Sequence, residues 1–312
     1  MAKTIRKITR SKKPENRPAA LKSRIKSIRM KRVVPEPKKK ITGAFRLFMD
    51  SASLFRQHWK LFVGISITYL LLNAVLAGGL SGGQNLTELK QTFTEEFGQT
   101  NAHIAVLGVL LGSSGSASSE SGSVYQSLVV IIVSLATIWS LRQVLAGDKF
   151  RIRDAFYRGM HPLIPFMLVL IFLGIILTPA IVGSFIYSAV FGGGLAAEWW
   201  EFLLWGILVF ILLFATLHLI VSYIFAFYIV TLPNMMPLAA IRAAKKLSTG
   251  HRWSILRKLI FLPLAFLVIC VIILLPLISI APGLVQFVFV AMSAFGLIFA
   301  HIYLYSLYKE LL

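Results

Sequence analysis

Long apolar runs constrain this chain more than any other feature of its sequence. A helix that crosses a lipid bilayer needs about 20 consecutive, mostly apolar residues, and several runs reach that length. We place membrane-spanning helices at residues 61–80, 124–145, 162–190, 200–230, 257–280 and 283–307. With 57% hydrophobic and 14% charged residues, the chain is too apolar for a soluble domain of its size. The sequence therefore predicts an all-α polytopic transmembrane helix bundle of about six spans within residues 41–312.

The first 40 residues differ from the rest of the chain in composition and charge. They hold 16 Lys and Arg against two Glu, a balance of +14 within a total of +20. Many like charges, four prolines and few large apolar side chains predict that residues 1–40 form a disordered basic tail. Leu21, Ile25 and Ile28 recur at helical spacing among basic residues. This pattern predicts one short amphipathic helix in the tail, suited to an anionic lipid surface.

The distribution of charge along the membrane domain predicts its orientation, because Lys and Arg accumulate in the short cytoplasmic loops of membrane proteins. If the N-terminus is cytoplasmic, the internal connections hold the bases Arg151, Arg153, Arg158, Arg242, Lys245, Lys246, Arg252, Arg257 and Lys258. The external segments, 81–123 and 191–201, hold six Glu and one Lys. We therefore expect a multi-pass protein of the plasma or inner membrane with both termini in the cytoplasm.

Proline, glycine and segment length refine the assignment of spans. The fifth and sixth spans come from one apolar stretch broken near Pro282-Gly283, a sequence typical of a tight turn between antiparallel helices. The third and fourth spans exceed the minimum length, and tilt, a kink at Pro179 or an extension into the headgroups accommodates the excess. The apolar segment 104–111 is too short to span, so we expect it to be external and either interfacial or re-entrant.

A basic amphipathic stretch precedes each odd-numbered span, which is the pattern of a threefold internal repeat. The stretches cover residues 44–59, 150–166 and 236–253. Their expected apolar faces are Phe45, Phe48, Ala52 and Phe55, then Phe150, Ile152, Ala155 and Phe156, then Leu238, Ile241 and Ala244. Gly159 and Gly250 are expected to end the second and third helices. Each repeat is then an elbow helix, meaning a short helix on the cytoplasmic surface, that leads into a pair of spans.

The third stretch carries a family resemblance. Its sequence PLAAIRAAKKLSTGHRWSILRKLIFLPL, residues 237–264, resembles the cytoplasmic signature of the bacterial glycerophosphoryl diester phosphodiesterase membrane-domain family and of uncharacterised inner-membrane proteins grouped with it. The resemblance is specific over residues 230–265 and architectural over 41–312. It implies a six-span membrane module without an activity, because the phosphodiesterase chemistry of that family belongs to a separate soluble domain.

The sequence offers no recognisable catalytic apparatus. Phosphodiester chemistry needs clustered carboxylates for a metal ion and an acid–base pair, whereas this chain has 12 acidic residues, none in the middle of an expected span. It contains no Walker-type phosphate loop, no His-Glu-x-x-His pair and, with one cysteine, no cysteine-based metal spacing. We therefore expect a protein that is not an enzyme and has no catalytic residue, cofactor or bound metal.

Two histidines lie within apolar runs and are candidates for an intramembrane polar pair. His218 falls in the fourth expected span and His301 in the sixth. Ionisable residues at such depth are functional candidates, and two packed helices would bring these two together. The alternative interpretation is that neutral imidazoles form ordinary interhelical hydrogen bonds.

Three functions remain open from the sequence. The leading hypothesis is a non-enzymatic membrane protein whose basic cytoplasmic face, formed by the nine bases of the internal connections, binds anionic phospholipid and organises or moves lipid or an envelope component. The second is a small-solute transporter or permease that uses His218 and His301. The third is a membrane tether for RNA or ribosomes through residues 1–40, which ranks lower because that tail has no aromatic residue for base stacking.

Overall fold

The computed structural model describes residues 42–76, 91–92, 106–108, 120–148, 150–194, 198–233 and 235–312. Residues Ile41–Leu312 form one compact unit. Within the described ranges the regular structure is helical throughout. The predicted basic tail with its amphipathic helix at Leu21, Ile25 and Ile28, and most of the predicted external loop 81–123, lie outside the described residues.

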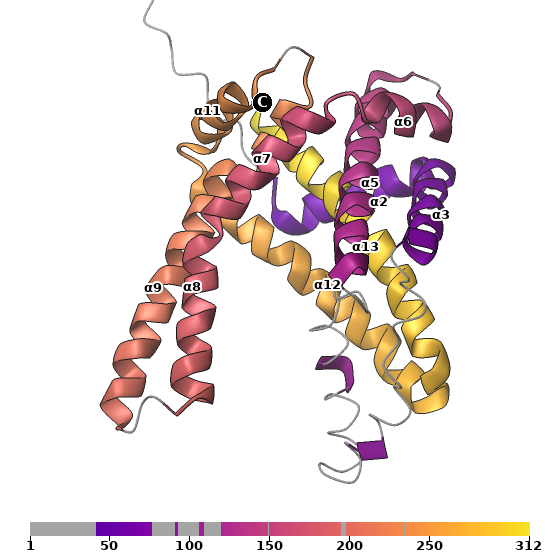
Figure 1. Ribbon diagram of the computed structural model, residues 1–312. Coiled ribbons are helices and arrows are strands. Elements are labelled where there is room, and N and C mark those ends of the chain that lie inside the picture. Colours follow the sequence, from indigo (N-terminus) through magenta and orange to yellow (C-terminus); the bar gives the residue numbers. More distant parts are fainter. Residues whose placement is uncertain are drawn as a thin grey trace, which may run out of the picture. The chain divides into compact units, whose positions relative to one another are not determined.

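Six helical segments are long and apolar enough to cross a membrane, which confirms the predicted all-α polytopic class. They are Trp59–Leu76 (α3), Val124–Ala146 within Glu120–Ala146 (α5), Leu163–Gly192, Trp199–Val230, Arg252–Ile280 (α12) and Pro282–Leu311 (α13). Figure 1 shows the C-terminus at one end of these helices and the turn between α12 and α13 at the other. We call the end with the C-terminus the elbow end, because two of the elbow helices described below lie there.

Two of the spans are broken into shorter helices. The third consists of Leu163–Ile176 (α7), Thr178–Tyr187 (α8) and the π-helix Ser188–Gly192 (η1). Pro179 stands in the first turn of α8, so the span is interrupted at the proline that was one of the three ways expected to accommodate its length. The fourth consists of Trp199–Tyr223 (α9) and Ala226–Val230 (α10). The predicted break between the last two spans is also present, since α12 ends at Ile280 and α13 begins at Pro282.

Each predicted elbow stretch contains a helix. These helices are Ala44–Gln57 (α2), Ile152–Gly159 (α6) and Pro237–Ser248 (α11), followed by spans α3, α7–α8 and α12. Figure 1 shows α6 and α11 at the elbow end. Gly250 follows α11 with φ +92°, the left-handed backbone that glycine adopts most readily, as expected of a residue that ends a helix.

The faces that the elbow helices bury differ from the prediction at two positions. Phe45 of α2 and Leu238 of α11 are 67% and 68% exposed. The buried positions of α2 are Leu47 and Ser51, one turn apart. Phe48 still packs edge-on against Phe299 of α13, with ring centroids 4.9 Å apart. The neighbouring helices cover only some of the apolar side chains of a short helix. The spacing of these residues alone does not decide which of them stay exposed.

The core is divided into three clusters along the spans. One surrounds α10 and α11, a second joins α3, α5 and α13, and a third lies between the parts of α12 and α13 that are near their turn. The third cluster includes Val106 and Leu107, which are buried in the same cluster as Leu274 of α12 and Val285 of α13. This part of the predicted segment 104–111 therefore packs on the end of the helices opposite the elbow end.

Candidate functional site

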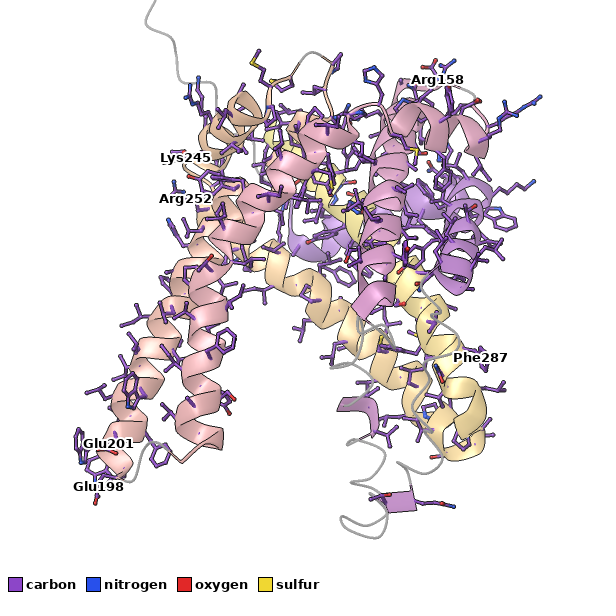
Figure 2. All side chains as sticks on the ribbon, viewed as in Figure 1. Arg158, Glu198, Glu201, Lys245, Arg252 and Phe287 are labelled. Atoms are coloured by element: carbon purple, nitrogen blue, oxygen red, sulfur yellow. The ribbon has the colours of Figure 1, made fainter. Side chains whose placement is uncertain are left out.

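Seven of the nine predicted lipid-contacting bases are exposed near the elbow end. They are Arg151, Arg153, Arg158, Arg242, Lys245, Lys246 and Arg257. Figure 2 labels Arg158 on α6 and Lys245 on α11, and Glu198 and Glu201 at the far end of α9. None of these seven bases lies within ion-pair distance of a carboxylate among the described residues, and the ion pair of Glu310 is with Lys258. The elbow end therefore carries exposed positive charge in excess of its acidic side chains, which include Asp154 of α6 and Glu310 of α13.

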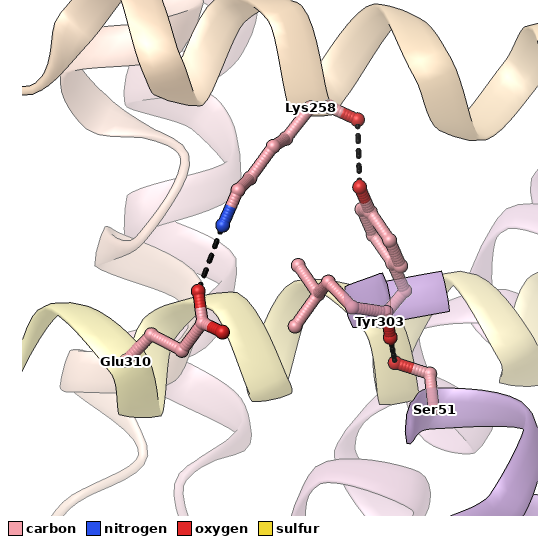
Figure 3. Close-up of polar contacts among 5 residues, drawn as sticks. Ser51, Lys258, Tyr303 and Glu310 are labelled. Atoms are coloured by element: carbon pink, nitrogen blue, oxygen red, sulfur yellow. Dashed lines mark hydrogen bonds and ion pairs between the residues drawn. The ribbon is translucent and has the colours of Figure 1, made fainter. Parts of the chain in front are cut away.

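Lys258 departs from the predicted lipid contact. Its Nζ lies 2.7 Å from Oε2 of Glu310, and its side chain is 4% exposed. The Tyr303 hydroxyl donates a hydrogen bond to the Lys258 carbonyl oxygen over 3.1 Å (Figure 3). Because a buried charge needs a partner, Lys258 is occupied in joining α12 to α13 and does not face lipid. The sequence could not reveal this, since the two partners are separated by 52 positions.

The exposed arginines near the start of α6 form no ion pair with the neighbouring Asp154. Asp154 uses Oδ2 to accept a hydrogen bond from the Arg151 backbone N–H at 3.1 Å. This contact caps the first turn of α6, where an acidic side chain is favourable. The Arg151 and Arg153 guanidinium groups remain exposed.

His301 lies within a polar contact that joins three spans. Its Nε2 is 2.9 Å from the Ser134 Oγ on α5, and its Nδ1 is 3.3 Å from the Tyr228 hydroxyl on α10. Tyr228 is 1% exposed and Ser134 is 6% exposed. The arrangement matches the alternative interpretation, in which histidine forms interhelical hydrogen bonds.

His218 has a different partner, so the expected intramembrane pair with His301 does not form. The His218 Nε2 lies 2.7 Å from Nη1 of Arg252, the first residue of α12. His218 is exposed, and Arg252 is half-buried with a buried Nε that has no hydrogen-bond partner. Arg252 was predicted as a lipid contact and His218 as part of a histidine pair, and the structure brings these two residues together instead.

Arg142 is a further polar residue at the elbow end, and sequence reasoning missed it. It stands in the last turns of α5, and its guanidinium donates to the carbonyl oxygens of Tyr228, at 2.6 Å, and Thr231, at 2.5 Å. A third hydrogen bond joins the Arg142 guanidinium to the Thr231 hydroxyl. These acceptors are at the end of α10, where carbonyl groups lack helical partners. A lone arginine near the end of an apolar run is the signal that was available.

Comparison with known proteins finds no matching family model, no matching curated protein and no matching solved structure. The resemblance of residues 237–264 to the phosphodiesterase membrane-domain family therefore stays a prediction. The part of the chain that the structure describes also contains no group of three His, Cys, Asp or Glu residues placed to hold a metal ion.

Proposed function

We propose that this protein is a non-enzymatic membrane protein whose elbow end faces the cytoplasm and binds anionic phospholipid. The observation that carries the proposal is the group of seven exposed bases on α6, on α11 and near the start of α12, without an acidic partner among the described residues. Each Lys or Arg beside an anionic leaflet gains about 1 kcal/mol. The cytoplasmic orientation follows from the same bases, because positive charge marks the cytoplasmic side. Both termini are then cytoplasmic.

The exposed surface of the spans supports a role in organising or moving lipid. In the most apolar windows of Trp199–Val230 and α12, 11% of the residues are buried, against 50% in α5. Most side chains of these two spans are therefore at least partly exposed on the surface of the described chain.

Retention of lipid by the purified protein tests the proposal. The protein in detergent is equilibrated with equal amounts of phosphatidylglycerol and phosphatidylcholine, and retained lipids are counted by native mass spectrometry. We expect enrichment of phosphatidylglycerol that falls at high salt, because exposed charges are screened. Changing Arg151, Arg153, Arg158, Arg242, Lys245 and Lys246 to Gln should lower the enrichment markedly, because these six are most of the seven exposed bases. The matched control is Glu198→Gln with Glu201→Gln, and equal retention of both lipids by the wild type would contradict the proposal.

The two other functions receive less support. A solute pathway built on a pair of His218 and His301 is not favoured, because each histidine bonds to other residues. The tether for RNA or ribosomes depends on residues 1–40, which lie outside the described residues, and it stays a prediction.

A further inference from the structure

The His218–Arg252 pair stands on a lipid-facing surface of α9. His218 shares one side of this helix with Phe214, Ile211 and Ile207, which precede it by 4, 7 and 11 positions. These three side chains are 53–55% exposed. Hydrogen-bonding groups without partners at the end of an apolar stripe cost free energy in lipid. A polar partner is needed to offset that cost.

The pair presents only hydrogen-bond donors. A guanidinium has no acceptor, so the His218 Nε2 must accept the 2.7 Å bond from Arg252 and the imidazole proton must stand on Nδ1. The His218 Nδ1–H and the other terminal N–H groups of Arg252 have no partner among the described residues, and the Arg252 Nε is buried. No carboxylate of the described chain neutralises Arg252. The ligand that completes such a pair is an anion with several acceptor oxygens.

The pair lies about one helical turn from the elbow helix α11, which the proposed function places at the membrane surface. The Ser248 hydroxyl, at the end of elbow helix α11, donates to the Ser222 carbonyl oxygen of α9 over 3.1 Å. His218 stands four residues before Ser222, about 6 Å further from α11 along the axis of α9 at 1.5 Å of rise per residue. Figure 2 shows Lys245 and Arg252 on the same side of the molecule near this junction. A phosphate bound to this pair would lie between the elbow helix and the apolar stripe.

We propose that His218 and Arg252 bind the phosphodiester of one anionic phospholipid, with an acyl chain along Phe214, Ile211 and Ile207. This inference rests on the proposed function. It adds a site for one lipid molecule to the surface formed by the seven exposed bases. Arginine suits the ligand because its planar fork pairs with phosphate oxygens in a bidentate manner, and the neutral imidazole adds a further donor.

Titration of a single retained lipid tests the site. Wild type and variants in detergent are titrated with phosphatidylglycerol, and the affinity of the last lipid to dissociate is measured by native mass spectrometry. We expect Arg252→Gln and His218→Leu each to weaken that affinity about tenfold or more, as expected for loss of charge-assisted hydrogen bonds. His218→Leu guards against misfolding, since an exposed leucine suits a lipid-facing position. The matched control, Arg257→Gln, removes an exposed charge of the same helix and should change the affinity less than threefold.

The outcomes separate the inference from the proposed function. Equal affinity of wild type, Arg252→Gln and His218→Leu would overturn the site while leaving the enrichment of phosphatidylglycerol intact. No enrichment in the wild type would overturn both. Displacement of the last lipid by millimolar inorganic phosphate would show a site for soluble phosphate and would also overturn the inference. We expect inorganic phosphate to leave the lipid bound, because the apolar stripe contributes to the affinity of the lipid alone.

Discussion

The Arg142 guanidinium donates to the backbone carbonyl of Tyr228 over 2.6 Å, so α5 holds the end of α10. Arg142→Lys keeps the charge but cannot reach both carbonyls with a planar fork. We expect a loss of about 1.5–3 kcal/mol in the free energy of unfolding, the range for a hydrogen bond to a charged group, while the Tyr228 carbonyl keeps the Thr231 hydroxyl as a donor. Thermal or chemical unfolding in detergent measures it. Arg153→Lys, at an exposed position, is the control, and equal stability of the two variants would contradict the role of Arg142.

Replacing one partner of the Lys258–Glu310 ion pair should lower the free energy of unfolding more than replacing both partners. Lys258→Met alone leaves Glu310 without a partner, and we expect a loss of about 3 kcal/mol in unfolding free energy. The double variant Lys258→Met with Glu310→Leu should recover most of that loss, because two apolar side chains replace two desolvated charges. A double-mutant cycle in detergent tests both statements. They are contradicted if the loss of unfolding free energy in the double variant equals the sum of the losses in the two single variants.

His301 is expected to stabilise the helix packing without acting in lipid binding. His301→Ala removes the contacts to Ser134 and Tyr228 and leaves a cavity, so we expect a loss of about 2–3 kcal/mol in unfolding free energy. The His301→Ala variant should retain phosphatidylglycerol with the same enrichment as the wild type. Tyr228→Phe removes only the 3.3 Å contact and should cost about 1 kcal/mol. Loss of lipid enrichment in a stably folded His301→Ala variant would contradict this division of roles.

Gly159 permits a close approach between α6 and α5. A Cβ at this position would lie 3.0 Å from the Ala136 Cα, a backbone atom that cannot move aside. We expect Gly159→Ala to destabilise the protein by about 1–3 kcal/mol. The control is Gly206→Ala in α9, where a Cβ meets nothing within 4 Å and helix propensity favours alanine by up to about 1 kcal/mol. Unfolding in detergent should rank Gly206→Ala above wild type and Gly159→Ala below it, and the reverse order would contradict the packing.

The spans could be predicted because crossing a bilayer demands a length of apolar chain that few other structures require. The helix breaks at Pro179 and Pro282 followed equally from local stereochemistry. Gly159 shows the limit of such reasoning, since the sequence suggested a helix end and the structure adds a contact with another helix.

The polar contacts escaped prediction because their partners are distant in sequence. The Lys258–Glu310 pair, the Arg142–Tyr228 bond and the His218–Arg252 pair each join different helices, at separations of 52, 86 and 34 positions. Periodicity specifies which residues share a helix face. It does not specify which faces meet, so a pairing of His218 with His301 was as compatible with the sequence as the contacts that occur.

Cysteine accessibility from one side of the membrane tests most directly whether the basic elbow end faces the cytoplasm. In a Cys270→Ser background, single cysteines replace Arg158, Lys246 and Trp199, all of which are exposed. A membrane-impermeant maleimide added to intact cells should label Trp199→Cys, and should label Arg158→Cys and Lys246→Cys only after the membrane is opened. Labelling of Lys246→Cys in intact cells, or of Arg158→Cys and Lys246→Cys from different sides, would contradict the proposed orientation and the lipid-binding role that depends on it.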